Sequence, residues 1–197
     1  GATYTATDES GDAYLFTSRL AKLAGARGAA FAMGRTVARI ATEGGRVSGV
    51  SVRGPEGSEE VLQADAYVLA LGAYSPLVAR GLGLALPVYP AKGYSATVAV
   101  TDGARAPRVS LTDDEAKIVF SRLGERLRIA GTAELSGYST ELNTGRCEAL
   151  IRRARQIFPG AADYDHAACW TGLRPSTPSN VPLVGRTRYP NLFLNTG

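Results

Sequence analysis

The feature that most constrains the fold is a nearly continuous apolar run at residues 64–72, Ala-Asp-Ala-Tyr-Val-Leu-Ala-Leu-Gly. Its length suits a strand, and its lack of regular polar alternation predicts a strand buried on both faces, as in a parallel sheet. Earlier in the chain, residues 13–28 carry apolar side chains at helical spacing and end in a glycine. A helix and a buried strand in this region predict an α/β architecture over residues 13–86.

The pattern changes after Pro87, where short alternating segments are separated by turn dipeptides such as Asp102-Gly103. Strands are predicted at residues 88–100, 108–111, 117–120, 126–131, 167–173 and 192–195. A single strong helix is predicted at residues 144–158, because its apolar residues form one stripe before Pro159-Gly160. Residues 87–173 are therefore predicted to form an α+β domain with a mixed or antiparallel sheet and one covering helix.

The remaining segments connect these two parts. Residues 1–12 are predicted to be a connection from the second domain, and residues 174–197 to return to the first. Within residues 13–86, a short strand is predicted at 29–33. A hairpin is predicted from 36–42 and 46–53 around the turn Glu43-Gly44-Gly45.

Composition excludes several classes of function. The chain has two cysteines and one histidine, so a zinc site or a Ser-His-Asp triad is not expected. Both cysteines are predicted to be buried in a reducing cytoplasm. The net charge of +4 is scattered, and its main cluster, Arg152-Arg153-Ala154-Arg155, is predicted to be a solvated helix face, so no nucleic-acid partner is expected. The chain has no apolar run long enough to span a bilayer.

Arg174 is the strongest candidate for a functional residue. It stands between an apolar strand-like run and a loop that Pro175, Pro178 and Pro182 stiffen. A guanidinium can hold a carboxylate with two parallel hydrogen bonds. From these residues alone, a surface arginine in a turn and a carboxylate-binding arginine are both compatible with the pattern.

The segment Trp170-Thr-Gly-Leu-Arg-Pro-Ser-Thr-Pro resembles the W-x-G-L-R-P-x-T-P-D signature of FAD-dependent amine and D-amino-acid oxidoreductases, above all the D-amino-acid dehydrogenases. Ser179-Asn180 replaces the usual Asp-Gly, and asparagine can still make that turn. Further segments resemble the same family in order and spacing along the chain: 9–12, 44–50, 64–76, 86–95, 131–134 and 195–197.

The resemblance implies roles for individual residues. Arg174 would bind the substrate carboxylate, and Tyr94 would line the substrate pocket near the flavin. The implied FAD-binding positions are Val37, through its backbone to the adenine, and Ala70, Gly72, Ala73, Gly172 and Gly197. Small residues at a strand end permit close approach of a cofactor, although Leu69–Gly72 also reads simply as a buried strand with a turn glycine.

The implied activity is oxidative deamination of D-amino acids to 2-oxo acids and ammonia, by hydride transfer to FAD. The electron acceptor would be a quinone or an electron-transfer chain. The implied location is the cytoplasm, with peripheral attachment to the inner face of the bacterial inner membrane and homodimer formation left open. Two alternatives remain: a glycine or sarcosine oxidase-like enzyme, and a non-catalytic carboxylate-binding module.

The family's Gly-x-Gly-x-x-Gly motif, which holds the FAD pyrophosphate at a helix N-terminus, does not occur in these 197 residues. We therefore expect an internal fragment, inactive by itself, with a partial Rossmann-like FAD-binding domain and a mixed or antiparallel substrate domain.

Overall fold

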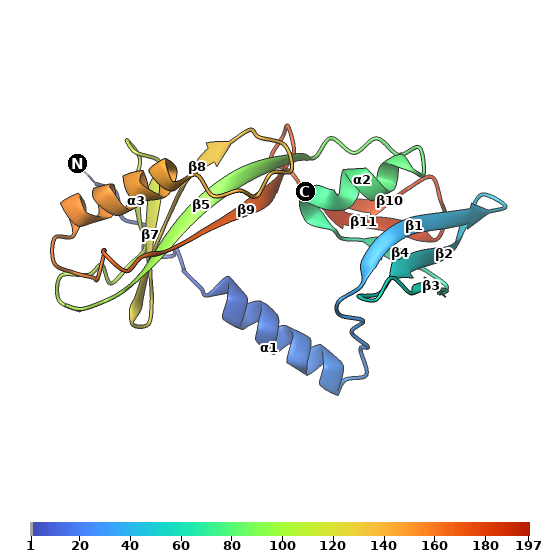
Figure 1. Ribbon diagram of the computed structural model, residues 1–197, viewed down its shortest axis with the longest axis horizontal. Coiled ribbons are helices and arrows are strands. Elements are labelled where there is room, and N and C mark those ends of the chain that lie inside the picture. The colour runs from blue at the N-terminus through green and yellow to red at the C-terminus, as the bar shows by residue number, and fades with distance from the viewer. Residues whose placement is uncertain (1) are drawn as a thin grey trace. The chain divides into compact units, whose positions relative to one another are not determined.

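The computed structural model describes residues 2–197, which divide into two compact units (Figure 1). The first unit contains the segment up to Ala30, Gly93–Glu134 and Thr140–Gly172. The second contains Phe31–Lys92, Leu135–Ser139 and Leu173–Gly197. The fold is α/β with mixed and antiparallel sheets, which confirms the predicted fold class. Residues 13–30, predicted to accompany the FAD-binding part, group here with the first unit.

The first unit is built on a five-stranded sheet with the order β6-β7-β8-β5-β9. Its strands are β5 (Tyr89–Ala99), β6 (Leu111–Asp113), β7 (Ile118–Leu123), β8 (Arg126–Glu134) and β9 (Ala168–Ser176). Residues 89–92 at the start of β5 and residues 173–176 at the end of β9 belong to the second unit. The helix α3 (Thr144–Ile157) packs against β8 and covers one face of the sheet (Figure 1).

The core of the first unit follows from period-two alternation in the strands. Leu127 and Ile129 on β8 are fully buried, as is Leu150 on α3. The side chain of Asn143 caps α3 by accepting a hydrogen bond from the backbone N–H of Arg146, as expected for an N-cap asparagine. The predicted helix at 144–158 is confirmed.

The two cysteines lie in or beside this core. Cys147 is buried, Cys169 is half-buried, and their thiols interact. Burial, with a smaller contribution from the Cys169 thiol, raises the pKa of Cys147 to about 12. Cys147 is therefore a protonated thiol at neutral pH, as predicted for a small buried apolar residue.

An ion pair between β6 and α3 makes the stability of this unit depend on pH. Asp113 accepts a hydrogen bond from Arg153 Nε at 2.5 Å. This bond, and a weaker one from the backbone N–H of Ala116, lower the pKa of the Asp113 carboxyl. In the unfolded chain the carboxyl takes up its proton at a higher pH. Its stabilising contribution is therefore complete above the unfolded pKa and is lost as the pH falls through the folded pKa.

We expect D113N to remove this dependence. The free energy of unfolding of the wild type, measured with urea from neutral pH down to pH about 3, should fall toward that of D113N as the solution is acidified. R153Q removes the same bond from the other side and should flatten the curve in the same way. A gap between wild type and D113N that stays constant over this pH range would contradict the assignment.

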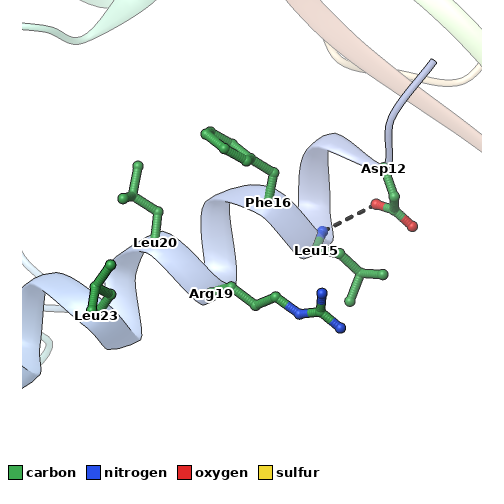
Figure 2. Close-up of a pocket in the computed structure, with 6 residues that line it drawn as sticks. All are labelled: Asp12, Leu15, Phe16, Arg19, Leu20 and Leu23. Atoms are coloured by element: carbon green, nitrogen blue, oxygen red, sulfur yellow. Dashed lines mark hydrogen bonds between the residues drawn. The ribbon is translucent and has the colours of Figure 1, made fainter. Parts of the chain in front are cut away.

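The helix α1 (Ala13–Ala26) begins at Asp12, whose carboxylate accepts hydrogen bonds from the backbone N–H groups of Tyr14 and Leu15. This confirms the predicted helix at 13–28. None of its residues is buried in the structure, and Figure 2 shows apolar side chains that project from the helix. These exposed side chains include Leu15, Phe16, Leu20 and Leu23. Among residues 2–197, no helix is long and apolar enough to cross a membrane.

The second unit contains two three-stranded sheets. An antiparallel sheet joins β1 (Thr36–Glu43), β2 (Arg46–Arg53) and β3 (Glu59–Leu62), which confirms the predicted hairpin. The other sheet has the order β10-β11-β4, from β10 (Leu183–Arg186), β11 (Leu192–Thr196) and β4 (Tyr67–Leu69). Strands β4 and β11 are parallel. The helical turn η1 (Gly72–Tyr74) and the helix α2 (Ser75–Arg80) follow β4 directly.

Three sequence predictions are wrong in detail. Residues 29–33 form no strand, since they lie between turns at Gly28 and Gly34, which both have positive φ. The apolar run 64–72 shortens to the three-residue strand β4, which lies at a sheet edge and leaves 63% of Val68 exposed. The strand predicted at 108–111 is displaced to Leu111–Asp113, where β7 supplies a pairing partner.

Candidate functional site

The candidate site starts from the carboxyl ends of two parallel strands in the second unit. Leu69 at the end of β4 pairs with Leu194 on β11, so the chain leaves both strands at the same edge. Beyond β4 come Ala70, Leu71 and Gly72, and beyond Leu194 come Asn195, Thr196 and Gly197. Ligands of α/β sheets bind outside such carboxyl ends. The predicted cofactor positions Ala70, Gly72 and Gly197 lie in these two segments.

Hydrogen bonds from side-chain hydroxyls join the two segments. Thr196 Oγ1 donates a hydrogen bond to the carbonyl oxygen of Gly72 at 3.0 Å. Ser75 Oγ lies 2.7 Å from Thr196 Oγ1 and therefore donates to it. Ser75 is fully buried and Thr196 is 5% exposed, so water does not compete with these bonds. The edge is held rigidly by groups that sequence analysis did not single out.

Arg174 lies near the end of β9 with an exposed side chain. The loop that follows is closed by a hydrogen bond that the Thr177 hydroxyl donates to the Val181 carbonyl at 2.9 Å. Asn180 has a φ of 57°. This left-handed conformation confirms that asparagine makes the turn for which the family uses Asp-Gly.

The loop after Arg174 packs against the two glycines of the strand edge. A Cβ on Gly72 would lie 3.8 Å from the ring of Pro175, which is ordinary contact distance. A Cβ on Gly197 would lie 2.9 Å from Thr177 Cγ2, which is too close, and Gly197 also has a φ of 102°. The second unit therefore brings the segment of Arg174 to the same edge as Gly72 and Gly197.

Two tyrosines stand beside this edge within the second unit. Tyr74 and Tyr138 stack with ring centroids 5.6 Å apart. The Tyr138 hydroxyl donates to the carbonyl oxygen of Ala73 at 3.1 Å. Ala73, another predicted cofactor position, is itself buried. The methyl group of Ala73 is therefore not available to a ligand, and only the backbone beside it could make such a contact.

Other predicted site residues lie away from this edge. Val37 is half-buried on β1, where the register with β2 shifts between Val37 and Arg39. This irregularity leaves backbone outside the regular ladder. Val37, Leu77 and Val78 line a cavity of about 530 Å³ between β1 and α2. A backbone role for Val37 stays a prediction.

Tyr94 belongs to the first unit and is 1% exposed. Its hydroxyl donates to Glu134 Oε2 at 2.5 Å, and Glu134 also pairs with Arg146 at 3.2 Å. The Tyr94 ring packs in the core beneath α3. Its role in a substrate pocket stays a prediction. Gly172, also in the first unit, lies under the indole of Trp170, whose Cη2 would be 2.1 Å from an added Cβ.

The family pattern described as FAD dependent oxidoreductase matches residues 1–197. The chain belongs to this family. The D-amino acid dehydrogenase of Dechloromonas aromatica (strain RCB) is 60% identical over 197 residues, which are 100% of this chain and 47% of that protein. The chain thus spans about half the length of the curated relatives it matches.

Solved FAD-dependent oxidoreductases have the same fold. The glycine oxidase of Geobacillus kaustophilus matches with a TM-score of 0.73 and 26% identity, over 91% of this chain and 47% of that one. The L-proline dehydrogenase of P. horikoshii reaches a TM-score of 0.77 over 93% of this chain and 49% of that one. At 16% identity the latter shows the fold alone.

The strand edge fits the cofactor of the family. Ala70 is small and exposed, and Gly72 has a φ of 53°, which a side chain would strain. Backbone that is bare of side chains at the ends of parallel strands can approach a dinucleotide closely. Ala70, Gly72 and Gly197 are therefore residues that could hold FAD, with the backbone fixed by Thr196.

Proposed function

We propose that Arg174 forms the substrate-carboxylate site of a D-amino-acid dehydrogenase and that Ala70, Gly72 and Gly197 form part of its FAD site. Such an enzyme converts D-amino acids to 2-oxo acids and ammonia. The observation that carries this proposal is the packing of the Arg174 loop against the glycines of the strand edge. The 60% identity to a D-amino acid dehydrogenase supports the choice of substrate class.

In this proposal Arg174 binds and orients the substrate. Its planar guanidinium donates two parallel hydrogen bonds to the α-carboxylate, which fixes the direction of the Cα–H bond. FAD, when bound, supplies the acceptor for the hydride of that bond. The imino acid product then reacts with water to give the 2-oxo acid and ammonia. The proposed electron acceptor is a quinone or an electron-transfer chain. The protein is proposed to attach peripherally to the inner membrane.

The proposal also gives a role to each of the other predicted site residues. Ala70, Gly72 and Gly197 present backbone to the cofactor, with Ala73 behind them. Val37 is proposed to bind through its backbone at the irregular part of β1. Tyr94 is proposed to line the substrate pocket, and Gly172 is proposed to be an FAD-binding position. Both residues belong to the first unit.

Anaerobic reduction of the whole protein that carries these residues tests the activity. We expect D-alanine to bleach the visible flavin band and L-alanine to leave it unchanged. A quinone should then restore the band faster than oxygen does. Bleaching by neither enantiomer would contradict the proposal.

A glycine oxidase-like activity is the second candidate, since the Geobacillus kaustophilus enzyme is 26% identical. It predicts bleaching by glycine or sarcosine, and rapid reoxidation by oxygen with release of hydrogen peroxide. The same anaerobic experiment therefore separates the two candidates.

FAD affinity should depend strongly on residues outside this chain. We expect the 197-residue chain to bind FAD at least about a hundredfold more weakly than the whole protein, because the motif that holds the pyrophosphate is absent from it. Quenching of flavin fluorescence on titration measures both affinities. Equal affinities would show that the strand edge described above suffices for binding. Absence of flavin from the whole protein as well would favour a non-catalytic carboxylate-binding module.

A further inference from the structure

The sheet of the first unit has a second face with chemistry of its own. Leu127 and Ile129 of β8 point to the side covered by α3, so Arg128, which lies between them, points to the opposite face. There it contacts Ser95 of β5 and Trp170 of β9. Arg128 and Trp170 line a cavity of about 400 Å³, a volume suited to a small molecule.

The charge of Arg128 is not balanced by a neighbouring carboxylate. Its side chain is half-buried, and its guanidinium makes one long hydrogen bond, from Nη2 to Ser95 Oγ at 3.4 Å. Its carbon Cζ also lies 6.0 Å from the centre of the Trp170 ring. Within residues 2–197, the structure places no acidic side chain within ion-pair distance of it. A partly desolvated guanidinium with unused donors favours the binding of an anion.

The one carboxylate in the cavity is already occupied. Asp12 pairs with Arg126, whose Nη2 lies 3.4 Å from Asp12 Oδ2. Its other oxygen accepts hydrogen bonds from the backbone N–H groups of Tyr14 and Leu15 at the start of α1, one of which Figure 2 shows. Asp12 and Arg126 neutralise each other, so the cavity keeps the positive charge of Arg128.

Trp170 supplies a flat apolar surface beside this charge. The absence of a side chain at Gly172 lets the indole lie along β9. Even so, 59% of Trp170, the only tryptophan of the chain, remains exposed. This is a large exposed fraction for a tryptophan side chain. Aromatic rings prefer to stack on such a surface in an offset arrangement.

We propose that this cavity binds a small aromatic carboxylate, with its carboxylate paired to Arg128 and its ring against Trp170. The residues that line this cavity belong to the first unit, whereas Arg174 belongs to the second, and the proposal does not depend on the function proposed above. Thr97 and Leu123 complete its polar and apolar walls.

In the whole protein, the difference in fluorescence between the wild type and W170F reports binding at this cavity, because Trp170 lines it and is the only residue changed. Benzoate is the probe, and we expect a saturable change in emission. Acetate lacks the ring and benzylamine has the opposite charge, so both should give at least about a tenfold weaker response. Equal responses to benzoate and benzylamine would overturn the proposal.

Variants then locate the response. R128Q should weaken benzoate binding at least about tenfold, with urea unfolding used to confirm that its stability matches the wild type. R186Q is the matched control, since Arg186 also lies over an aromatic ring, Phe193 at 5.6 Å, but in the second unit. R174Q should leave the response intact. If R174Q rather than R128Q removes it, benzoate reports the Arg174 site and the proposal for this cavity is wrong.

Discussion

Replacing Arg174 with alanine in the whole protein is expected to lower kcat/KM for D-amino acids by roughly 30- to 4,000-fold. Truncating one partner of a charged hydrogen-bonded pair costs about 2–5 kcal/mol, and each 1.4 kcal/mol is a factor of about ten. The loss should appear mostly as a higher KM if Arg174 binds substrate and transition state equally, and partly in kcat if it also orients Cα–H. Steady-state kinetics with D-alanine measure both.

Two further variants sharpen this result. R174K keeps the charge but loses the planar fork, so it should retain only part of the activity. R186A removes an exposed arginine of β10 in the same unit and should change kcat/KM little. Unchanged KM and kcat in R174A would exclude a carboxylate-binding role for Arg174, whatever the cofactor content of the protein.

The largest effect on stability is expected at Asn191. This residue is 5% exposed, and its side chain makes two hydrogen bonds to the backbone of Val47 on β2. Oδ1 accepts from the Val47 N–H and Nδ2 donates to the Val47 carbonyl, both at 2.9 Å. Its own carbonyl accepts from the N–H of Tyr67. Asn191 therefore links β2 to the sheet of β4 and β11.

We expect N191A to lose about 2–4 kcal/mol of unfolding free energy, because it leaves a buried donor and a buried acceptor of Val47 without partners. N191D restores the acceptor but not the donor and should not rescue the loss. The control N195A removes an exposed asparagine from β11 and should cost little. Urea unfolding measures all three. A loss below about 1 kcal/mol in N191A would mean that water replaces the amide.

Local patterns were sufficient to predict much of this architecture. Gly44 and Gly45 fixed the hairpin because their left-handed backbone suits a tight turn. The apolar stripe of 144–158 predicted α3, since amphipathic periodicity reflects one covered face. The position of Arg174 at a strand end followed from Pro175 and the prolines after it.

Features that depend on distant pairing could not be predicted. The exposure of Val68 follows from the edge position of β4, which no local pattern encodes. The cavity at Arg128 exists because β8 and β9 both flank β5, so Arg128 and Trp170 meet only in the folded sheet. Thr196 and Ser75 are ordinary polar residues in the sequence, and only their contact reveals how they hold the candidate site.

The close packing of Gly197 against Thr177 also bears on how this protein can evolve. Any side chain at position 197 would press on the loop that carries Arg174, so the position of that loop depends on a glycine remote from it in sequence. The side chains of Tyr74 and Tyr138, which are exposed beside the same edge, are held by their stacking and by the Tyr138 hydrogen bond to the Ala73 carbonyl. Side chains can therefore change more easily at the two tyrosines than at Gly197, where a substitution would also disturb the backbone framework.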